Sequence, residues 1–376
     1  MRSIAAALFL VGFTTAAHAD SPPHEFLDEA KTLAVVGACA EGTASVKEEV
    51  YAAHCKTVRK AQDEYKTSWL APAKEFFATN VPKTIPQKVV YPFAGGDLST
   101  ALTVYPDAEE ITTLSLEPAG DPQALGKLSD KAIKVALSTV ATELSSLYRS
   151  NFSVTMNMIT AMRGGNLPTQ LIFSLSALTI HGYELTSLKY FKVNADGTLA
   201  YITDADVESL AKLKDAGARN RAFANVEMKF HKKGATKEQT YRHILANLDD
   251  AHIKKEPGAL KYLEAKGNVA AMTKAASYLL TFDDFKAMRK YVIDHVDWMV
   301  SDTTGLAPKY GTPEGFEYET WGRWDGPNMA AGGSIAPSWK AMYASQQKRE
   351  LKFRFGYPDM KLHGHLIIMK RGTKKS

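Results

Sequence analysis

One stretch of the chain, KVVYPFAGGDLSTALTVYPDAEEITTLSLEPAGDP, constrains the fold more than any other. It holds two short apolar runs, 89–94 and 111–116, each of a length and composition typical of a buried strand. Asp97 follows the first run and can cap a short helix over 98–104, because its carboxylate can accept hydrogen bonds from the free N–H groups at a helix start. This strand–helix–strand order predicts two parallel strands joined by a right-handed crossover.

The residues before this stretch have a helical pattern. Apolar residues recur at helical spacing over 24–78, with lysine and glutamate between them. Gly42 and Thr43 interrupt the pattern, which predicts two antiparallel helices. Pro72, Pro82 and Pro86 together predict a change of structure, because proline cannot continue a helix interior.

The remaining elements are expected to alternate between helices and strands. Asp121 and Pro122 fit the cap and first position of a long helix, and Gly197 and Gly234 fit hairpin turns. The predicted helices are 123–148, 169–181 and 256–295. The predicted strands are 185–193 with 199–203, 226–231 with 240–248, and 298–301, 351–357 and 363–369. Residues 305–337, which are rich in glycine, proline and aromatic residues, are predicted to form a long ordered loop.

These elements predict an α/β fold. We expect a Rossmann-like parallel core extended by antiparallel strands, with an N-terminal helical hairpin. The predicted division is a signal peptide over 1–19, a helical N-terminal segment over 20–86 and a Rossmann-like α/β domain over 87–376.

The N-terminus has the three parts of an export signal. Arg2 supplies a positive start, residues 4–13 are apolar, and the A-H-A run at 17–19 fits signal peptidase cleavage before Asp20. No later stretch reaches the roughly 20 unbroken apolar residues of a membrane helix. We therefore predict a periplasmic or secreted protein that does not span a membrane.

The two cysteines, Cys39 and Cys55, are predicted to form a disulfide, because an even count in an exported chain favours pairing. Closing a loop of about 15 residues contributes on the order of 3 kcal/mol in the chain-entropy model. No metal site is predicted. His54 adds only one ligand to the cysteines, and His363 with His365 would need at least one more.

The charge balance gives no support to nucleic-acid binding. The formal charge is +5, from 46 lysines and arginines against 41 acidic residues, and the two signs are interspersed. Nucleic-acid binding requires a concentrated basic face, so no nucleic-acid partner is expected.

The turn after the first apolar run, Gly95-Gly96-Asp97, resembles the start of the Rossmann-like methyltransferase fold, which binds S-adenosylmethionine. In that resemblance, Gly95 and Gly96 let a ligand approach the backbone at a helix start, and Glu117 accepts hydrogen bonds from a ribose diol. The resemblance covers residues 89–117. The family's acidic first-strand residue and its G-x-G run are replaced here by Tyr91-Pro92 and Gly95-Gly96, so the cofactor remains unknown.

A second resemblance covers residues 88–370. The phrases YPFAGGDLSTALTVYPDAEEITTLSLEPAG, TKAASYLLTFDDFKAMRKYVIDHVDWMVSDTTGLAP and LKFRFGY resemble a family of exported bacterial proteins. Its members commonly carry Y-P-F-S-G-P-D, an L-E-P-x-G corner and an acidic D-S-G turn, which D-T-T-G at 302–305 replaces here. The resemblance implies a common fold and a common pocket, with no established activity.

Three hypotheses about function follow. The first is a small-molecule site at the strand ends, under a loop that carries Trp321; its predicted residues are Gly95, Gly96, Asp97, Glu117, Asp302 and Trp321. The second is an enzyme on a methyltransferase-like frame, which needs a further group beside Asp97; the candidates are Asp249, Asp250 and Asp302. The third is a non-catalytic envelope interaction protein, which predicts exposed rings at Phe316, Tyr318, Trp321 and Trp324.

Overall fold

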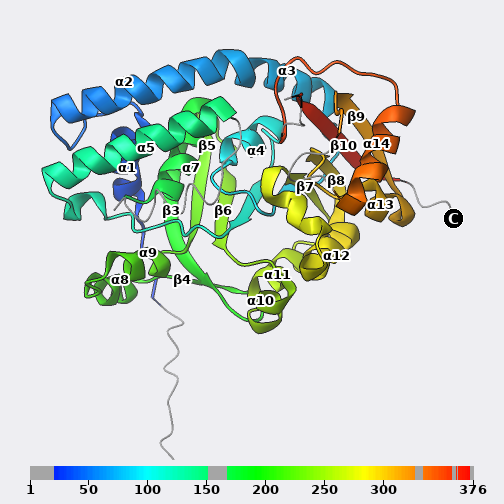
Figure 1. Cartoon of the computed structure of the whole chain (residues 1–376). Helices are drawn as coiled ribbons and strands as arrows, with labels where there is room; N and C mark the ends of the chain where they lie inside the picture. Colours follow the sequence, from blue (N-terminus) through cyan, green and yellow to red (C-terminus); the bar gives the residue numbers. More distant parts are fainter. Residues whose placement is uncertain (1–20, 151–166, 327–332, 358–360, 362, 373–376) are drawn as a thin grey trace, which may run out of the picture.

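The computed structural model describes residues 21–150, 167–326, 333–357, 361 and 363–372. The described strands form a ten-stranded sheet with helices on both faces (Figure 1). None of the helices within these ranges is long and apolar enough to cross a membrane. The predicted signal peptide lies outside the described residues and stays a prediction.

The sheet has a parallel centre. The strands are β1 (Lys88–Tyr91), β2 (Glu110–Ser115), β3 (Tyr183–Val193), β4 (Leu199–Tyr201), β5 (Asn225–Lys232), β6 (Gln239–Leu245), β7 (Val269–Thr273), β8 (Val296–Ser301), β9 (Phe316–Gly322) and β10 (His365–Arg371). Their order is β4-β3-β5-β6-β2-β1-β7-β8-β10-β9, and β6, β2, β1, β7 and β8 run parallel. Numbered along the chain, these parallel strands follow the order 3-2-1-4-5 of doubly wound sheets, which reverses between β1 and β7.

Antiparallel strands extend the sheet at both ends, as predicted. β5, β3 and β4 continue it beyond β6, and β10 and β9 continue it beyond β8. Both predicted hairpins form, with Gly197 (φ +91°) and Gly234 (φ +79°) at their turns. Glycine adopts this left-handed backbone without the steric cost that a Cβ imposes.

Helices cover both faces of the sheet. The helices are α1 (Leu27–Ala38), α2 (Glu48–Tyr65), α3 (Ala71–Asn80), α4 (Leu98–Val104), α5 (Asp130–Ser150), α7 (Thr169–His181), α8 (Asp204–Ala211), α9 (Ala216–Ala222), α10 (Asp250–Lys255), α11 (Gly258–Glu264), α12 (Lys286–His295), α13 (Pro308–Gly311) and α14 (Ala336–Ser345). Strand β1 shows the two faces: Val89 and Tyr91 join the core with α1, α4 and α7, whereas Val90 joins the core with α11 and α12. The long helices α2 and α5 lie side by side over the first face (Figure 1).

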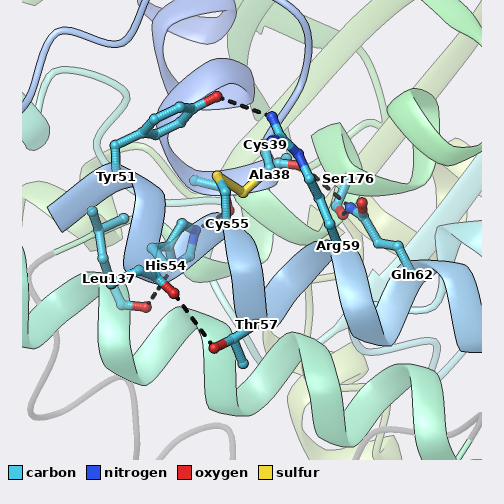
Figure 2. Close-up of a disulfide and its surroundings, with 12 residues drawn as sticks. Ala38, Cys39, Tyr51, His54, Cys55, Thr57, Arg59, Gln62, Leu137 and Ser176 are labelled. Carbon is cyan, nitrogen blue, oxygen red and sulfur yellow. Dashed lines mark hydrogen bonds between the residues drawn. A yellow bond between two sulfur atoms is a disulfide. The ribbon is translucent and has the colours of Figure 1, made fainter. Parts of the chain in front are cut away.

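The predicted disulfide ties the N-terminal helices together. Cys39 caps α1, Cys55 lies in α2, and their Cα atoms are 5.6 Å apart (Figure 2). The buried His54 lies beside them, with its Nε2 atom 2.9 Å from the Gly37 carbonyl oxygen and its Nδ1 atom 3.0 Å from that of Leu137 in α5. The helical N-terminal segment is thus joined to α5 as well as to itself.

Several predicted elements are wrong in detail. Of the three prolines, Pro82 and Pro86 lie in the link between α3 and β1, as predicted, but Pro72 lies in the first turn of α3, which follows a π-helical turn at Lys66–Leu70. The helix predicted from residue 123 begins at Asp130, since Asp121 pairs with Lys127 at 2.8 Å instead of capping it.

Three further corrections concern the second half of the chain. Residues 256–295 are not all helical, because the buried strand β7 divides them. Residues 351–357 form no strand in the described structure. Residues 305–337 are not a single loop, since they contain α13, β9 and the start of α14.

Candidate functional site

The carboxyl edge of the parallel strands holds the candidate site. Doubly wound sheets bind ligands in the crevice beyond the strand ends, at the point where the strand order reverses. Here that point lies between β1, which ends at Tyr91, and β7, which ends at Thr273. The residues that follow these two strands are Pro92 to Asp97 and Lys274.

A buried ion pair occupies this point. The Nζ atom of Lys274 lies 2.6 Å from Oδ2 of Asp97, and the two side chains are 1% and 4% exposed. The Tyr91 hydroxyl donates to the same oxygen at 3.1 Å. Asp97 also caps α4 as predicted, because its Oδ1 atom accepts from the backbone N–H and the hydroxyl of Thr100.

Asp302 lies close enough to Tyr91 for its charge to act on the tyrosine. It follows β8, is completely buried, and its Oδ1 atom accepts from the Thr304 N–H at 2.9 Å. Burial first, and then the negative charges of Asp97 and Asp302, hold the pKa of Tyr91 well above its ordinary value. We call Tyr91, Asp97, Lys274 and Asp302 the carboxyl-edge cluster.

Strained backbone flanks the cluster on both strands. Phe93, after β1, has φ +59°, and Ala275, after β7, has φ +55°. Non-glycine residues rarely adopt this left-handed conformation, which costs on the order of 1–2 kcal/mol. Such strain persists where the surrounding structure enforces it, and it gathers at binding sites and active sites.

Helix α7 fills the space beside the two glycines. The Gly95 carbonyl accepts from Nε2 of Gln170 at 3.0 Å. A Cβ built on Gly96 would lie only 2.3 Å from the Phe173 ring. The glycine pair therefore lets α7 approach the β1–α4 turn, and Phe173 occupies the face of Gly96 predicted to meet a ligand.

Glu117 lies just beyond the end of β2 and is buried. This is the strand-end position that the small-molecule hypothesis predicted for it. Its backbone carbonyl accepts from Nε2 of His243 at 2.7 Å, while Nδ1 of the same ring lies 3.2 Å from the Thr113 hydroxyl. A carbonyl can only accept, so Nε2 carries the proton. Burial lowers the pKa of His243 to about 4, so this ring is neutral at pH 7.

Residues 351–357 cover the cluster. The Phe355 ring lies 5.6 Å from Nζ of Lys274, and the Tyr357 N–H donates to Oδ2 of Asp302 at 2.7 Å. A Cβ on Gly356 would lie 2.4 Å from the Asp302 Cβ. The cover predicted for the Trp321 loop is therefore supplied by another segment.

Trp321 has a different place. It lies on β9, beyond β10, where its ring packs edge-on against Phe76 of α3 at 4.8 Å and its indole N–H donates to Glu319. Phe316 and Trp324 are buried, and Tyr318 and Trp321 are half-buried. The exposed aromatic patch expected of an envelope interaction protein is thus not formed by these rings.

Of the acidic candidates for an enzyme, Asp302 alone belongs to the cluster. Asp249 caps α10 by accepting from the His252 N–H at 2.8 Å. Asp250 accepts from the Lys286 and Ala287 N–H groups at the start of α12. Both carboxylates therefore serve helix ends.

The cysteines and histidines weighed for a metal site have other partners. Cys39, His54 and Cys55 lie close enough for a metal, but the disulfide removes both thiolates. His365 is buried, with Nε2 2.8 Å from the Thr303 hydroxyl, whereas Nδ1 of His363 lies 3.4 Å from Asp325. The two rings therefore have separate partners.

Neither Lys274 nor the role of Tyr91 was predictable from the patterns used for the other site residues. Lys274 follows the run Val269–Thr273, whose two alanines and flanking helical pattern favoured a helix. The usable signal was Gly267-Asn268 before a short apolar run, a break typical of a strand start.

Searches against protein-family models, against curated proteins and against solved structures each returned no match to this chain.

Proposed function

We propose that this is an exported protein that binds a small polar molecule at the carboxyl edge of its sheet. The observation that carries the proposal is the Asp97–Lys274 pair, buried at the reversal point between β1 and β7. Burying two charges costs several kcal/mol per ion, and apolar side chains of similar volume often stabilise a fold as well or better. A charged pair at the usual ligand position is thus better explained by recognition than by stability.

The resemblance to exported bacterial proteins supports the same site. The three sequence segments that carry this resemblance contain Asp97 after β1, Lys274 after β7, Asp302 after β8 and Phe355 in residues 351–357. Segments far apart in the chain therefore meet at one place. We propose membership of that family, and export through the signal at 1–19, on these grounds together with the disulfide.

The chemistry of the cluster defines the kind of ligand. A bound molecule would come between the two charges, offering an acceptor to Lys274 and a donor to Asp97. Phe355 and Gly356 must move aside for it, because they pack on Lys274 and Asp302. The cover has no regular secondary structure, so its displacement breaks no ladder of backbone hydrogen bonds.

A thermal-shift screen tests the proposal. The panel contains amino acids, sugars, nucleosides and S-adenosylmethionine, and we expect at least one compound to raise the melting temperature of the wild type. Asp97→Asn and Lys274→Gln should abolish that shift, while Asp283→Asn, at a carboxylate 85% exposed, should keep it. A panel without any active compound, or a shift that survives both cluster variants, would refute the site.

An enzyme is the second candidate, favoured by Asp302. A second carboxylate whose charge reaches Tyr91 offers a proton acceptor that binding alone does not need. Mass spectrometry of the bound compound tests this candidate. Conversion by the wild type, lost in Asp302→Asn while the thermal shift remains, would make the protein an enzyme; an unchanged compound would leave it a binding protein.

A further inference from the structure

A cavity of about 750 Å³ opens at the opposite, amino edge of the sheet, where β1 and β6 begin and β5 ends. Helix α3 and the segment joining it to β1 line it, together with the ends of α4 and α7. Sites for small molecules commonly have volumes of about 300–1,000 Å³. Its lining includes no residue of the carboxyl-edge cluster, so this amino-edge cavity is a separate site.

The charges around the cavity have one dominant sign. Four lysines line it, Lys74, Lys83, Lys232 and Lys237, against one acidic residue, Asp107. The Lys237 ammonium donates to the backbone carbonyl of Asp107 at 3.1 Å. Within the described ranges, none of the other three lysines forms an ion pair, so their charge is not neutralised by the chain.

The cations are close enough to affect one another. Burial, and then the charge of Lys232, lowers the pKa of Lys74. Burial, and then the charges of Lys74 and Lys232, lowers the pKa of His181 to about 3, with its Nε2 atom 3.0 Å from the Ser99 hydroxyl. An anion placed among these groups would be attracted by the lysines and would relieve their repulsion.

The walls behind the lysines are apolar. Phe77 and Val81 come from α3 and its end, Ile85 and Val89 from the approach to and start of β1, and Leu102 from α4. We propose that the amino-edge cavity binds a single-chain organic anion, with its carboxylate or phosphate at Lys74 and Lys232 and its chain against these apolar walls. The site does not depend on the function proposed for the carboxyl edge.

Isothermal titration calorimetry on the protein, with dodecanoate and dodecyl phosphate as probes below their micelle concentrations, tests this proposal. We expect one molecule to bind per chain, and dodecanol and inorganic phosphate to bind at least about ten-fold more weakly, because each lacks one half of the recognised chemistry. Lys74→Glu with Lys232→Glu should weaken dodecanoate at least about ten-fold, and raised salt should weaken it in the wild type.

Two further variants separate the site from general charge effects. Lys56→Glu with Lys131→Glu makes the same charge change at exposed positions outside the cavity, and should leave the affinity unchanged. Ala78→Trp, at an exposed lining residue, should block binding without changing any charge, and Asp97→Asn should not affect it.

The proposal is overturned if neither dodecanoate nor dodecyl phosphate binds, or if dodecanol binds as tightly as dodecanoate. It is also overturned if the control pair of lysine reversals weakens binding as much as the cavity pair. Binding to anionic phosphatidylglycerol vesicles without binding of the monomeric probes would assign the lysines to a membrane surface instead.

Discussion

The two edges of the same sheet hold their charges in opposite ways. At the carboxyl edge, Asp97 and Lys274 are buried and satisfy each other. At the amino edge, Lys74 and Lys232 are exposed at a cavity, and no described carboxylate pairs with them. The charges of the carboxyl edge are therefore matched within the chain, whereas the amino edge has unmatched charge beside a cavity.

This difference shows that the strand order sets where a crevice lies, but not whether the crevice is open to a ligand. The reversal of strand order places a crevice between β1 and β7 in any doubly wound sheet, but side chains decide whether that crevice stays open. Here Phe173 packs against Gly96 and Phe355 lies over Lys274. A ligand at the carboxyl edge must displace part of the chain, while a ligand at the amino edge would displace water.

The largest expected effect comes from breaking the buried pair. Lys274→Met leaves the Asp97 carboxylate buried without its cation, which should lower the free energy of unfolding by about 3–5 kcal/mol. Lys232→Met, at the amino edge, removes an exposed and unpaired charge and should change it by less than about 0.5 kcal/mol. Urea denaturation measures both values.

The background variant Asp97→Asn identifies the cause of that loss. Asparagine can still cap α4, and it leaves no buried charge when Lys274 is also replaced. Lys274→Met should therefore cost much less in the Asp97→Asn background than in the wild type. Equal costs in both backgrounds would mean that the lysine contributes packing and not charge.

Of the two residues in the buried ion pair, Asp97 could be predicted from the sequence and Lys274 could not. Asp97 was predictable because the start of a helix has a local signal, a capping residue before an apolar run. Lys274 was not, because its importance depends on β7 lying beside β1, a pairing between residues about 180 positions apart. The middle of its strand, Ala270-Ala271-Met272, also lacks the β-branched residues that favour strands.

The antiparallel ends of the sheet also show that contacts between neighbouring segments could be predicted, whereas contacts between distant segments could not. The β3–β4 and β5–β6 hairpins were predicted because their partners are joined by short turns that carry Gly197 and Gly234. Residues 351–357 have apolar alternation like a strand, yet they cover the cluster. Their role depends on Asp302, which no local pattern connects to them.

Alanine substitutions at two glycines, one at each edge, test how tightly the two edges are packed. Gly356 (φ +76°) packs on Asp302 at the carboxyl edge, while Gly234 (φ +79°), in the β5–β6 turn beside the amino edge, has no atom within 4 Å of the point where a Cβ would lie. Gly234→Ala should cost only the left-handed backbone strain, about 1–2 kcal/mol. Gly356→Ala adds a collision with Asp302 and should cost about 3 kcal/mol.

Thermal melts of the two glycine variants measure this difference. Equal destabilisation would show that the cover over Asp302 yields easily, and that the carboxyl edge is more open than its packing indicates. A larger cost at Gly356 would also predict that compounds found in the thermal-shift screen bind slowly, because the cover must open first.

Stability should also depend on pH through His243. Its pKa is about 4 in the folded protein and about 6.5 in an unfolded chain. The unfolded state therefore binds more protons as the pH falls from about 6.5 towards 4, and stability should fall by up to about 1.4 kcal/mol per pH unit from this ring alone. His243→Gln keeps a donor for the Glu117 carbonyl and does not titrate. The free energy of unfolding of His243→Gln, measured by urea denaturation between pH 7 and pH 4, should fall less steeply than that of the wild type. His181→Asn, at the amino edge, should also reduce the slope. Burial and the charges of nearby lysines lower the pKa of His181 to about 3. Slopes unchanged by His243→Gln would mean that this ring is not held neutral behind Glu117, and that the carboxyl edge admits water.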